Sequence, residues 1–148
     1  MKLQKNTLFA LYSLLEAASH PARQLSAGEI ARKYGVSSHH LAKVLHTLAR
    51  AGLVESARGV GGGYRFSGNA KRLTLMDVVQ LFENVDASPQ RGARHRSGVE
   101  RGLATVLAEI EEISKATLQS ISIATMLKLI QRQQRGSRSH GPAGPLPS

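Results

Sequence analysis

Four nitrogen-bearing side chains repeat along one short stretch of the sequence. They fall at intervals of four, three and four residues: His39, Lys43, His46 and Arg50. At roughly 100° per residue, this spacing places all of them on one face of an α-helix. Such a row offers hydrogen-bond donors and positive charge, which suit contact with phosphates and with the acceptor atoms of bases. The chemistry that we expect here is therefore binding to a polyanion.

The opposite face of the same predicted helix is apolar. Its stripe has the i, i+3, i+4, i+7 spacing of a buried helix face and consists of Leu41, Val44, Leu45 and Leu48. Ser37 is a suitable cap for the start of this helix, and Gly52 suits a left-handed residue just after its end. One side of the helix is thus expected to be buried while the other side carries the donors.

A predicted β-hairpin follows this helix. Residues 53–57 (LVESA) and a segment around Tyr64 to Phe66 favour strands, and a glycine-rich turn with Arg58 at its base separates them. We interpret the glycines as turn positions that need positive φ. A loop that cradles nucleotide phosphates is the alternative interpretation. That motif requires a following helix and a Gly-Lys-Ser/Thr ending, and the sequence has neither.

Two further helices are predicted ahead of the basic one. The first covers about Asn6 to Ala18, and the second begins at Ser26, which forms a capping box with Glu29. A tight turn containing Gly35 then leads into the basic helix, which is the pattern of a helix-turn-helix. With the hairpin added, residues 1–84 predict a winged helix-turn-helix that binds DNA, in a fold that is mainly α with a small β-hairpin wing.

The second half of the chain predicts a long helix. Residues 85–98 are polar and basic and are expected to form a flexible loop. The helix predicted over Val99 to Ser120 carries apolar residues at steps of 4, 3, 4 and 3, as in the seam of a coiled coil. These residues are Val99, Leu103, Val106, Ile110 and Ile113. We expect this helix to leave the domain and to pack on a second copy; the alternative is that it is buried against its own domain.

The end of the chain predicts one more helix and a tail. Ser122 is the expected cap of a helix that runs to Ile130, so residues 99–130 comprise the dimerisation helix and a C-terminal helix. From Gln131 the sequence is polar and rich in Pro and Gly, and residues 131–148 are expected to be disordered. A short helix that precedes the loop begins with a capping box of Thr74 and Asp77.

Composition narrows the class of protein. The chain of 148 residues has a formal net charge of +10; residues 1–73 hold 11 Lys and Arg against 3 acidic residues, whereas residues 74–148 hold 9 against 7. Because the excess of positive charge lies in the half with the predicted basic helix, double-stranded DNA is the expected partner. The alternative is a basic protein that has no polyanion partner. Since there is no cysteine, the chain has no disulfides, thiolate nucleophiles, cysteine-ligated zinc or all-thiolate iron–sulfur cluster.

Other classes of function are also disfavoured. The apolar runs are much shorter than the ~20 residues of a membrane span, and no signal peptide is recognised, so we expect a cytoplasmic protein without membrane contact. Neither paired carboxylates nor a Ser/His/Asp spacing is present, so we expect no catalytic residue, no metal site and no cofactor.

Several segments together resemble a known family. They are MKLQKNTLFAL, GVSSHHLAKVLHTLARAGLVESARGVGGGYRF, TLMDVV and ISIATML, and they cover roughly residues 1–130. They are similar to the Rrf-two family of bacterial transcription regulators, and the RAGLV…RGVGGGY segment is the most specific part. The resemblance implies winged-helix homodimers in which crossed long helices hold two DNA-binding units on a near-palindromic operator.

The resemblance also implies roles for individual residues. It makes the segment from Ser37 to Lys43 the base-reading end of the recognition helix and Arg58 a wing residue that enters a minor groove. Two departures from the family matter. Many members hold an iron–sulfur cluster with three cysteines in the loop before the long helix, whereas this loop has none and offers only His95 as a ligand. Phe9 stands where the family commonly has Tyr, which removes a hydroxyl that contacts phosphate.

We therefore expect a homodimeric, sequence-specific DNA-binding protein, a repressor without a cluster; the alternative is a regulator whose activity is set by a docked protein partner. The expected base-reading residues are Ser37, Ser38, His39 and Lys43. The expected phosphate contacts are Lys2, Lys5, His46 and Arg50. The expected wing residues are Arg58, Gly61, Gly62, Gly63, Tyr64 and Arg65.

Overall fold

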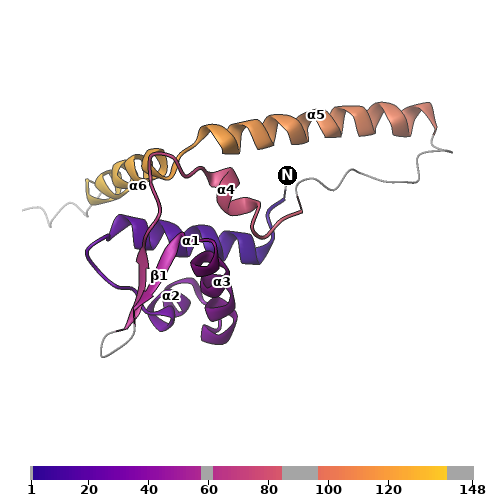
Figure 1. Ribbon diagram of the computed structural model, residues 1–148. Coiled ribbons are helices and arrows are strands. Elements are labelled where there is room, and N and C mark those ends of the chain that lie inside the picture. Colours follow the sequence, from indigo (N-terminus) through magenta and orange to yellow (C-terminus); the bar gives the residue numbers. More distant parts are fainter. Residues whose placement is uncertain (1, 58–61, 85–96, 140–148) are drawn as a thin grey trace, which may run out of the picture.

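The computed structural model describes residues 2–57, 62–84 and 97–139 of the chain (Figure 1). Its elements follow in the order α1 (Lys5–Ser19), α2 (Ala27–Tyr34), α3 (Ser38–Arg50), β1 (Val54–Ala57), β2 (Gly63–Phe66), α4 (Leu75–Val79), α5 (Gly98–Ser120) and α6 (Ile123–Arg138). The two strands form one antiparallel hairpin. The prediction of a mainly helical fold with a small hairpin wing is confirmed.

The local signals in the sequence mark the starts of α2, α3 and α4 and the end of α3 correctly. Ser26 and Glu29 form a complete capping box at the start of α2, and Thr74 and Asp77 form another at the start of α4. At the start of α3 the Ser37 hydroxyl accepts a hydrogen bond of 3.1 Å from a backbone N–H of the first turn. Gly52 follows the end of α3 with a φ of 77°, in the left-handed region that glycine tolerates best.

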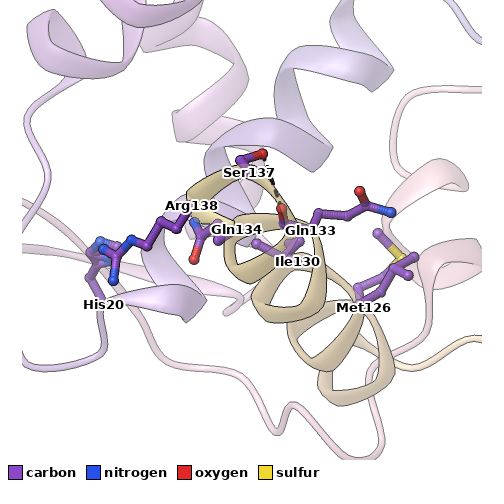
Figure 2. A pocket seen from close by; sticks show the side chains of 8 residues that line it. His20, Met126, Ile130, Gln133, Gln134, Ser137 and Arg138 are labelled. Atoms are coloured by element: carbon purple, nitrogen blue, oxygen red, sulfur yellow. Dashed lines mark hydrogen bonds between the residues drawn. The ribbon is translucent and has the colours of Figure 1, made fainter. Parts of the chain in front are cut away.

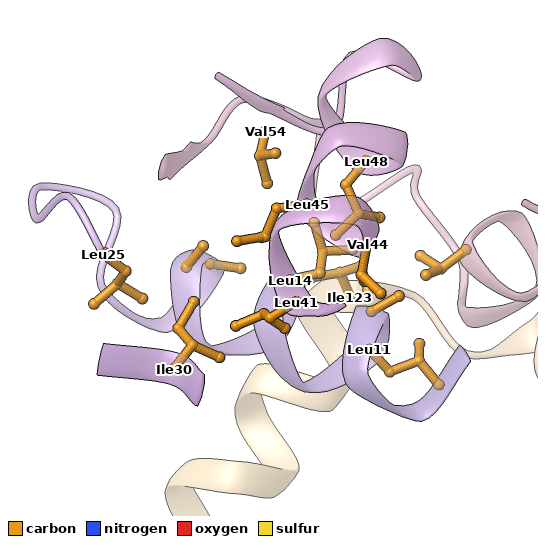
Figure 3. Close-up of a cluster of buried hydrophobic side chains, with 14 of the residues drawn as sticks. Leu11, Leu14, Leu25, Ile30, Leu41, Val44, Leu45, Leu48, Val54 and Ile123 are labelled. Atoms are coloured by element: carbon orange, nitrogen blue, oxygen red, sulfur yellow. The ribbon is translucent and has the colours of Figure 1, made fainter. Parts of the chain in front are cut away.

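The core gathers where α1, α2 and α3 meet the hairpin (Figure 3). The apolar stripe of α3 is buried along its whole length, and Leu14 of α1 is fully buried. Burial of a side chain of this size contributes about 1.5–3 kcal/mol. These contacts fix the rotation of α3 about its axis, and that rotation decides which of its side chains point outward.

The hairpin is attached to the domain by backbone pairing as well as by side chains. The Leu25 N–H donates to the Tyr64 carbonyl at 2.9 Å, and the Tyr64 N–H donates to the Leu25 carbonyl at 2.8 Å. A Cβ atom on Gly63 would lie 2.6 Å from the Leu25 oxygen. The glycine is therefore needed for a close approach of two backbones. Gly63 does not have a positive φ, so the predicted need for positive φ in this turn does not apply at this position.

Helix α5 extends away from the rest of the fold (Figure 1). None of its residues is buried. The expectation that this helix leaves the domain agrees with the structure, and the alternative of burial against its own domain is wrong. The helix begins at Gly98, one residue earlier than predicted, after a capping box of Ser97 and Glu100.

Helix α6 returns to the domain. Its first residue, Ile123, is fully buried, and its N–H donates to the Leu73 carbonyl at 2.8 Å. The helix then continues through Arg138, so residues 131–138 are helical and the predicted disorder is wrong for them. Gln and Arg are good helix formers, and Arg135 and Arg138 complement the negative end of the helix dipole. No helix within the described ranges is long and apolar enough to cross a membrane.

Candidate nucleic-acid interface

The outer face of α3 presents the predicted row of nitrogen-bearing side chains. His39, Lys43, His46 and Arg50 are all exposed, while the opposite stripe of the helix is buried. Figure 1 shows α3 at the edge of the domain, on the far side of α1 from α5 and α6. A helix displayed in this way can enter a groove of DNA without first separating from its own domain.

The start of α3 combines capping with exposed polar groups. The Ser37 hydroxyl accepts the bond that caps the helix, so its oxygen already has a partner while its proton stays available for donation. Ser38 and His39 are exposed in the first turn. The free N–H groups at this end also carry the positive end of the helix dipole, which adds to the attraction for phosphate.

His40, the neighbour of His39, has a different role. It is half-buried, and its Nε2 atom lies 2.5 Å from the Asn6 Oδ1 atom of α1. The Phe9 ring packs edge-on against the same imidazole, with ring centroids 6.1 Å apart. The start of α1 therefore braces the start of α3. Sequence reasoning missed this contact, although Asn6 and Phe9 are one helical turn apart on α1 and so share a face.

A carboxylate also holds the start of α1 in place. Glu83 accepts hydrogen bonds from the Gln4 N–H at 2.6 Å and from the Thr7 hydroxyl at 2.8 Å. A negative charge is favourable at the positive end of a helix dipole. Lys2 and Lys5 are exposed in this segment. The N-terminal segment, which contains the predicted phosphate contacts Lys2 and Lys5, is thus held in place by Glu83 and by α3.

The wing is only partly described. Arg65 is exposed and lies directly opposite Glu55 in the hairpin, whereas Tyr64 is half-buried and packs against the core. Gly62 is half-buried, and Gly63 has the structural role at Leu25 described above. Arg58 and Gly61 lie outside the described residues. Arg65 is therefore the predicted wing residue that the described part of the hairpin presents to solvent.

A second group of charges is used within the domain. Glu16 accepts hydrogen bonds from Lys33 and from the Tyr34 hydroxyl. Partial burial alone would raise the pKa of Glu16, but these hydrogen bonds and the Lys33 charge outweigh it, so the pKa lies below its ordinary value. Burial and the neighbouring carboxylate raise the pKa of Tyr34. The charge of Lys33 is thus paired with Glu16 at the surface and does not join the row on α3.

The predicted seam of α5 is an exposed apolar surface. Its residues are between 49% and 82% exposed: Val99, Leu103, Val106, Ile110 and Ile113. A contiguous apolar surface of this kind is typical of a protein–protein contact. The seam and the basic row on α3 are separate surfaces, because α1 and α4 lie between them (Figure 1).

Comparisons with known proteins identify relatives over nearly the whole chain. Residues 3–129 match the Rrf2 family, described as "Iron-dependent Transcriptional regulator". The chain is 50% identical over 144 residues to the "Putative HTH-type transcriptional regulator BadM" of Rhodopseudomonas palustris. The aligned residues make up 97% of this chain and 92% of that protein. It is 44% identical over 84 residues to "Protein aau3" of Rhizobium meliloti, over 57% of this chain and 54% of that one.

Solved structures share the fold. CymR of B. subtilis, described as the global cysteine regulator of that organism, matches with a TM-score of 0.71 and 25% identity, over 87% of this chain and 98% of CymR. IscR of T. potens matches with a TM-score of 0.63 and 24% identity, over 97% of this chain and 94% of IscR. The latter likeness supports the fold alone.

The iron in the family description does not fit this chain as a cluster. The sequence contains no cysteine, so no thiolate is available to hold iron and sulfide. Across residues 2–57, 62–84 and 97–139, no group of three His, Asp or Glu side chains is arranged to hold a metal ion. We therefore derive no step of the function from iron.

The basic row on α3, the hairpin and the family match agree with one another. The match extends over most of the chain, and the 50% identical relative is matched over almost its full length. The chain belongs to the Rrf2 family and is a DNA-binding transcriptional regulator, not an enzyme.

Proposed function

We propose that the chain binds a specific, near-palindromic DNA operator as a homodimer and represses transcription by occupying it. One observation carries the proposal: α3 buries its apolar stripe in the core and presents His39, Lys43, His46 and Arg50 to solvent. A helix held in this way has one surface left for a groove of DNA, and that surface carries donors and positive charge.

The exposed residues of α3 divide into two roles. Ser37, Ser38, His39 and Lys43 lie at the N-terminal end, which enters the major groove in helix-turn-helix proteins. Lys43 is the best donor to the guanine O6 and N7 acceptors. Phosphate contacts that set the register come from Lys2, Lys5, His46 and Arg50.

The wing adds a contact outside the major groove. Gly63 and Tyr64 fix the hairpin to Leu25, and this attachment orients Arg65. We propose that Arg65, and Arg58 by its resemblance to the family's wing residue, bind beside or within the minor groove. Arginine there favours narrow, A·T-rich sequence.

The seam of α5 supplies the second DNA-binding unit. Pairing two copies through Val99, Leu103, Val106, Ile110 and Ile113 buries side chains that are otherwise exposed. A two-fold symmetric dimer matches a palindromic site whose halves lie about one helical turn of DNA apart, or a multiple of that distance. The spacing of the half-sites is thus a direct readout of the dimer.

Selection of bound sequences from random duplex DNA tests this proposal. The purified full chain should enrich a two-fold symmetric motif. In titrations at fixed salt, Lys43→Ala should then cost about 1–3 kcal/mol on the enriched site and less on random DNA. The matched control is Lys128→Ala, an exposed lysine on α6, which should leave both affinities unchanged. Enrichment of no motif, or an equal loss for the two variants, would refute the assignment of α3.

A further inference from the structure

An open groove runs along α6 beside His20, the residue that follows α1 (Figure 2). Its volume is about 780 Å³. Sites for small molecules usually measure about 300–1,000 Å³. The groove is lined by His20, Met126, Leu129, Ile130, Gln133, Gln134, Ser137 and Arg138. It shares no residue with the basic row on α3 or with the seam of α5.

The lining changes in character along the groove. Met126, Leu129 and Ile130 supply an apolar part, and Leu129 remains 46% exposed there. At the other end, Arg138 reaches from the last turn of α6 toward His20 (Figure 2). An apolar wall that ends in a guanidinium and an imidazole is complementary to a molecule with an apolar body and an anionic head.

No carboxylate of the lining competes for this cation. The lining residues include no Asp or Glu, and α6 has none from Ile123 to Arg138. In the part of the chain that the structure describes, no acidic side chain pairs with Arg138. Glu16 lies on α1, four residues before His20, and interacts electrostatically with it, while its Oε1 atom already accepts hydrogen bonds from Lys33 and Tyr34. Among the described residues, the Arg138 guanidinium thus has no carboxylate partner and can accept an incoming anion.

We propose that this groove binds a small apolar carboxylate. Its body packs on Met126, Leu129 and Ile130, and its carboxylate accepts two parallel hydrogen bonds from Arg138 and one from His20. The carbonyls at the end of α6 carry partial negative charge, which is unfavourable for a nearby anion. The anion therefore binds to the Arg138 side chain, which extends away from the helix end (Figure 2).

The location also suits regulation, and this part rests on the proposed function. Helix α1 packs against α6 and also against α3. A ligand that joins the end of α1 to α6 therefore contacts the helix that braces the DNA-binding helix. A ligand that prefers one arrangement of α1 and α6 shifts the population toward it, and with it the affinity for DNA.

The test uses 2-naphthoate as the probe and its neutral isostere 2-naphthamide as the comparison. Binding to the full chain is followed by the fluorescence of the naphthalene ring. Wild type should bind the carboxylate more tightly than the amide. Arg138→Gln should weaken 2-naphthoate about ten- to hundredfold, as expected for the loss of charge-assisted hydrogen bonds, and should leave the amide unchanged.

Arg132→Gln is the matched control, because it removes the same charge from the same helix outside the groove. It should leave the affinity for both probes unchanged. Absence of 2-naphthoate binding, equal binding of acid and amide, or an equal loss in the two Arg variants would overturn the proposal. The competing occupant of the groove is a second copy of the chain. If the proposal is right, Leu129→Asp should leave the oligomeric state unchanged in sedimentation. A shift to monomer would show instead that a second copy covers the groove.

Titration of the selected DNA with and without 2-naphthoate separates this inference from the proposed function. Arg138→Gln should bind DNA as wild type does when the probe is absent. A severalfold change in DNA affinity caused by 2-naphthoate in wild type, and lost in Arg138→Gln, would support the regulatory role. Bound 2-naphthoate that leaves DNA affinity unchanged would refute that role, while failure to bind DNA in either condition would refute the proposed function.

Discussion

Gly63→Ala should destabilise the domain through a single methyl group. The added Cβ would lie 2.6 Å from the Leu25 oxygen and 2.8 Å from the Leu25 carbonyl carbon, and both are backbone atoms that no side-chain rotation can move aside. The hairpin must therefore shift, which lengthens the two hydrogen bonds of 2.9 Å and 2.8 Å that join Leu25 and Tyr64. At about 0.5–1.5 kcal/mol for each bond, the expected loss is about 1–3 kcal/mol.

The measurement is urea unfolding followed by far-UV circular dichroism at one protein concentration. Gly28→Ala is the control, because a Cβ there meets only the Ser26 hydroxyl oxygen, at an ordinary 3.9 Å. That helical glycine should lose no stability on substitution and should gain up to about 1 kcal/mol. Gly63→Ala should also weaken DNA binding, since the wing moves. Unchanged unfolding of Gly63→Ala, or an equal loss in Gly28→Ala, would refute the close-approach argument.

Three further predictions concern other parts of the molecule. Ile110→Asp places a charge in the seam of α5, so sedimentation should show a monomer; an unaltered dimer would move the interface elsewhere. Asn6→Ala removes the side chain bonded to His40 and should lower DNA affinity about two- to tenfold in an anisotropy titration, in line with one lost hydrogen bond. No change would mean that this brace does not position α3. Because the pKa of Glu16 is lowered in the fold, its contribution to stability is complete above its ordinary value of 4.5 and is lost as the pH falls below that value. Glu16→Gln should flatten the pH dependence of the unfolding midpoint in this acidic range, and a parallel profile would contradict the pairing.

The sequence predicted best what local spacing determines. The buried and exposed faces of α3 follow from its helical period, and the caps at Ser26, Ser37 and Thr74 follow from side chains that reach only three residues ahead. These signals place the basic row on an outward face before any tertiary contact is known.

Contacts between distant segments escaped prediction. Glu83 bonds to Gln4 and Thr7 across 79 and 76 residues of sequence, and no local pattern indicates that pairing. The sequence around Gly63 indicates a turn residue, but the structure shows that a Cβ at this position would collide with the Leu25 backbone. Leu25 lies in a different segment, so the local sequence does not reveal this constraint. The end of α6 was placed too early because the polar, basic composition from Gln131 onward outweighed the helical propensity of its Gln and Arg residues.

In the proposed dimer, the exposed position of α5 would link folding to protein concentration. Helices in proteins draw most of their stability from the packing of an apolar face. No residue of α5 is buried within its own subunit. By mass action, its helical content should then decline on dilution while the α1–α3 core keeps its structure. The cell's supply of this regulator would set not only how many operators are occupied but also what fraction of each chain is ordered.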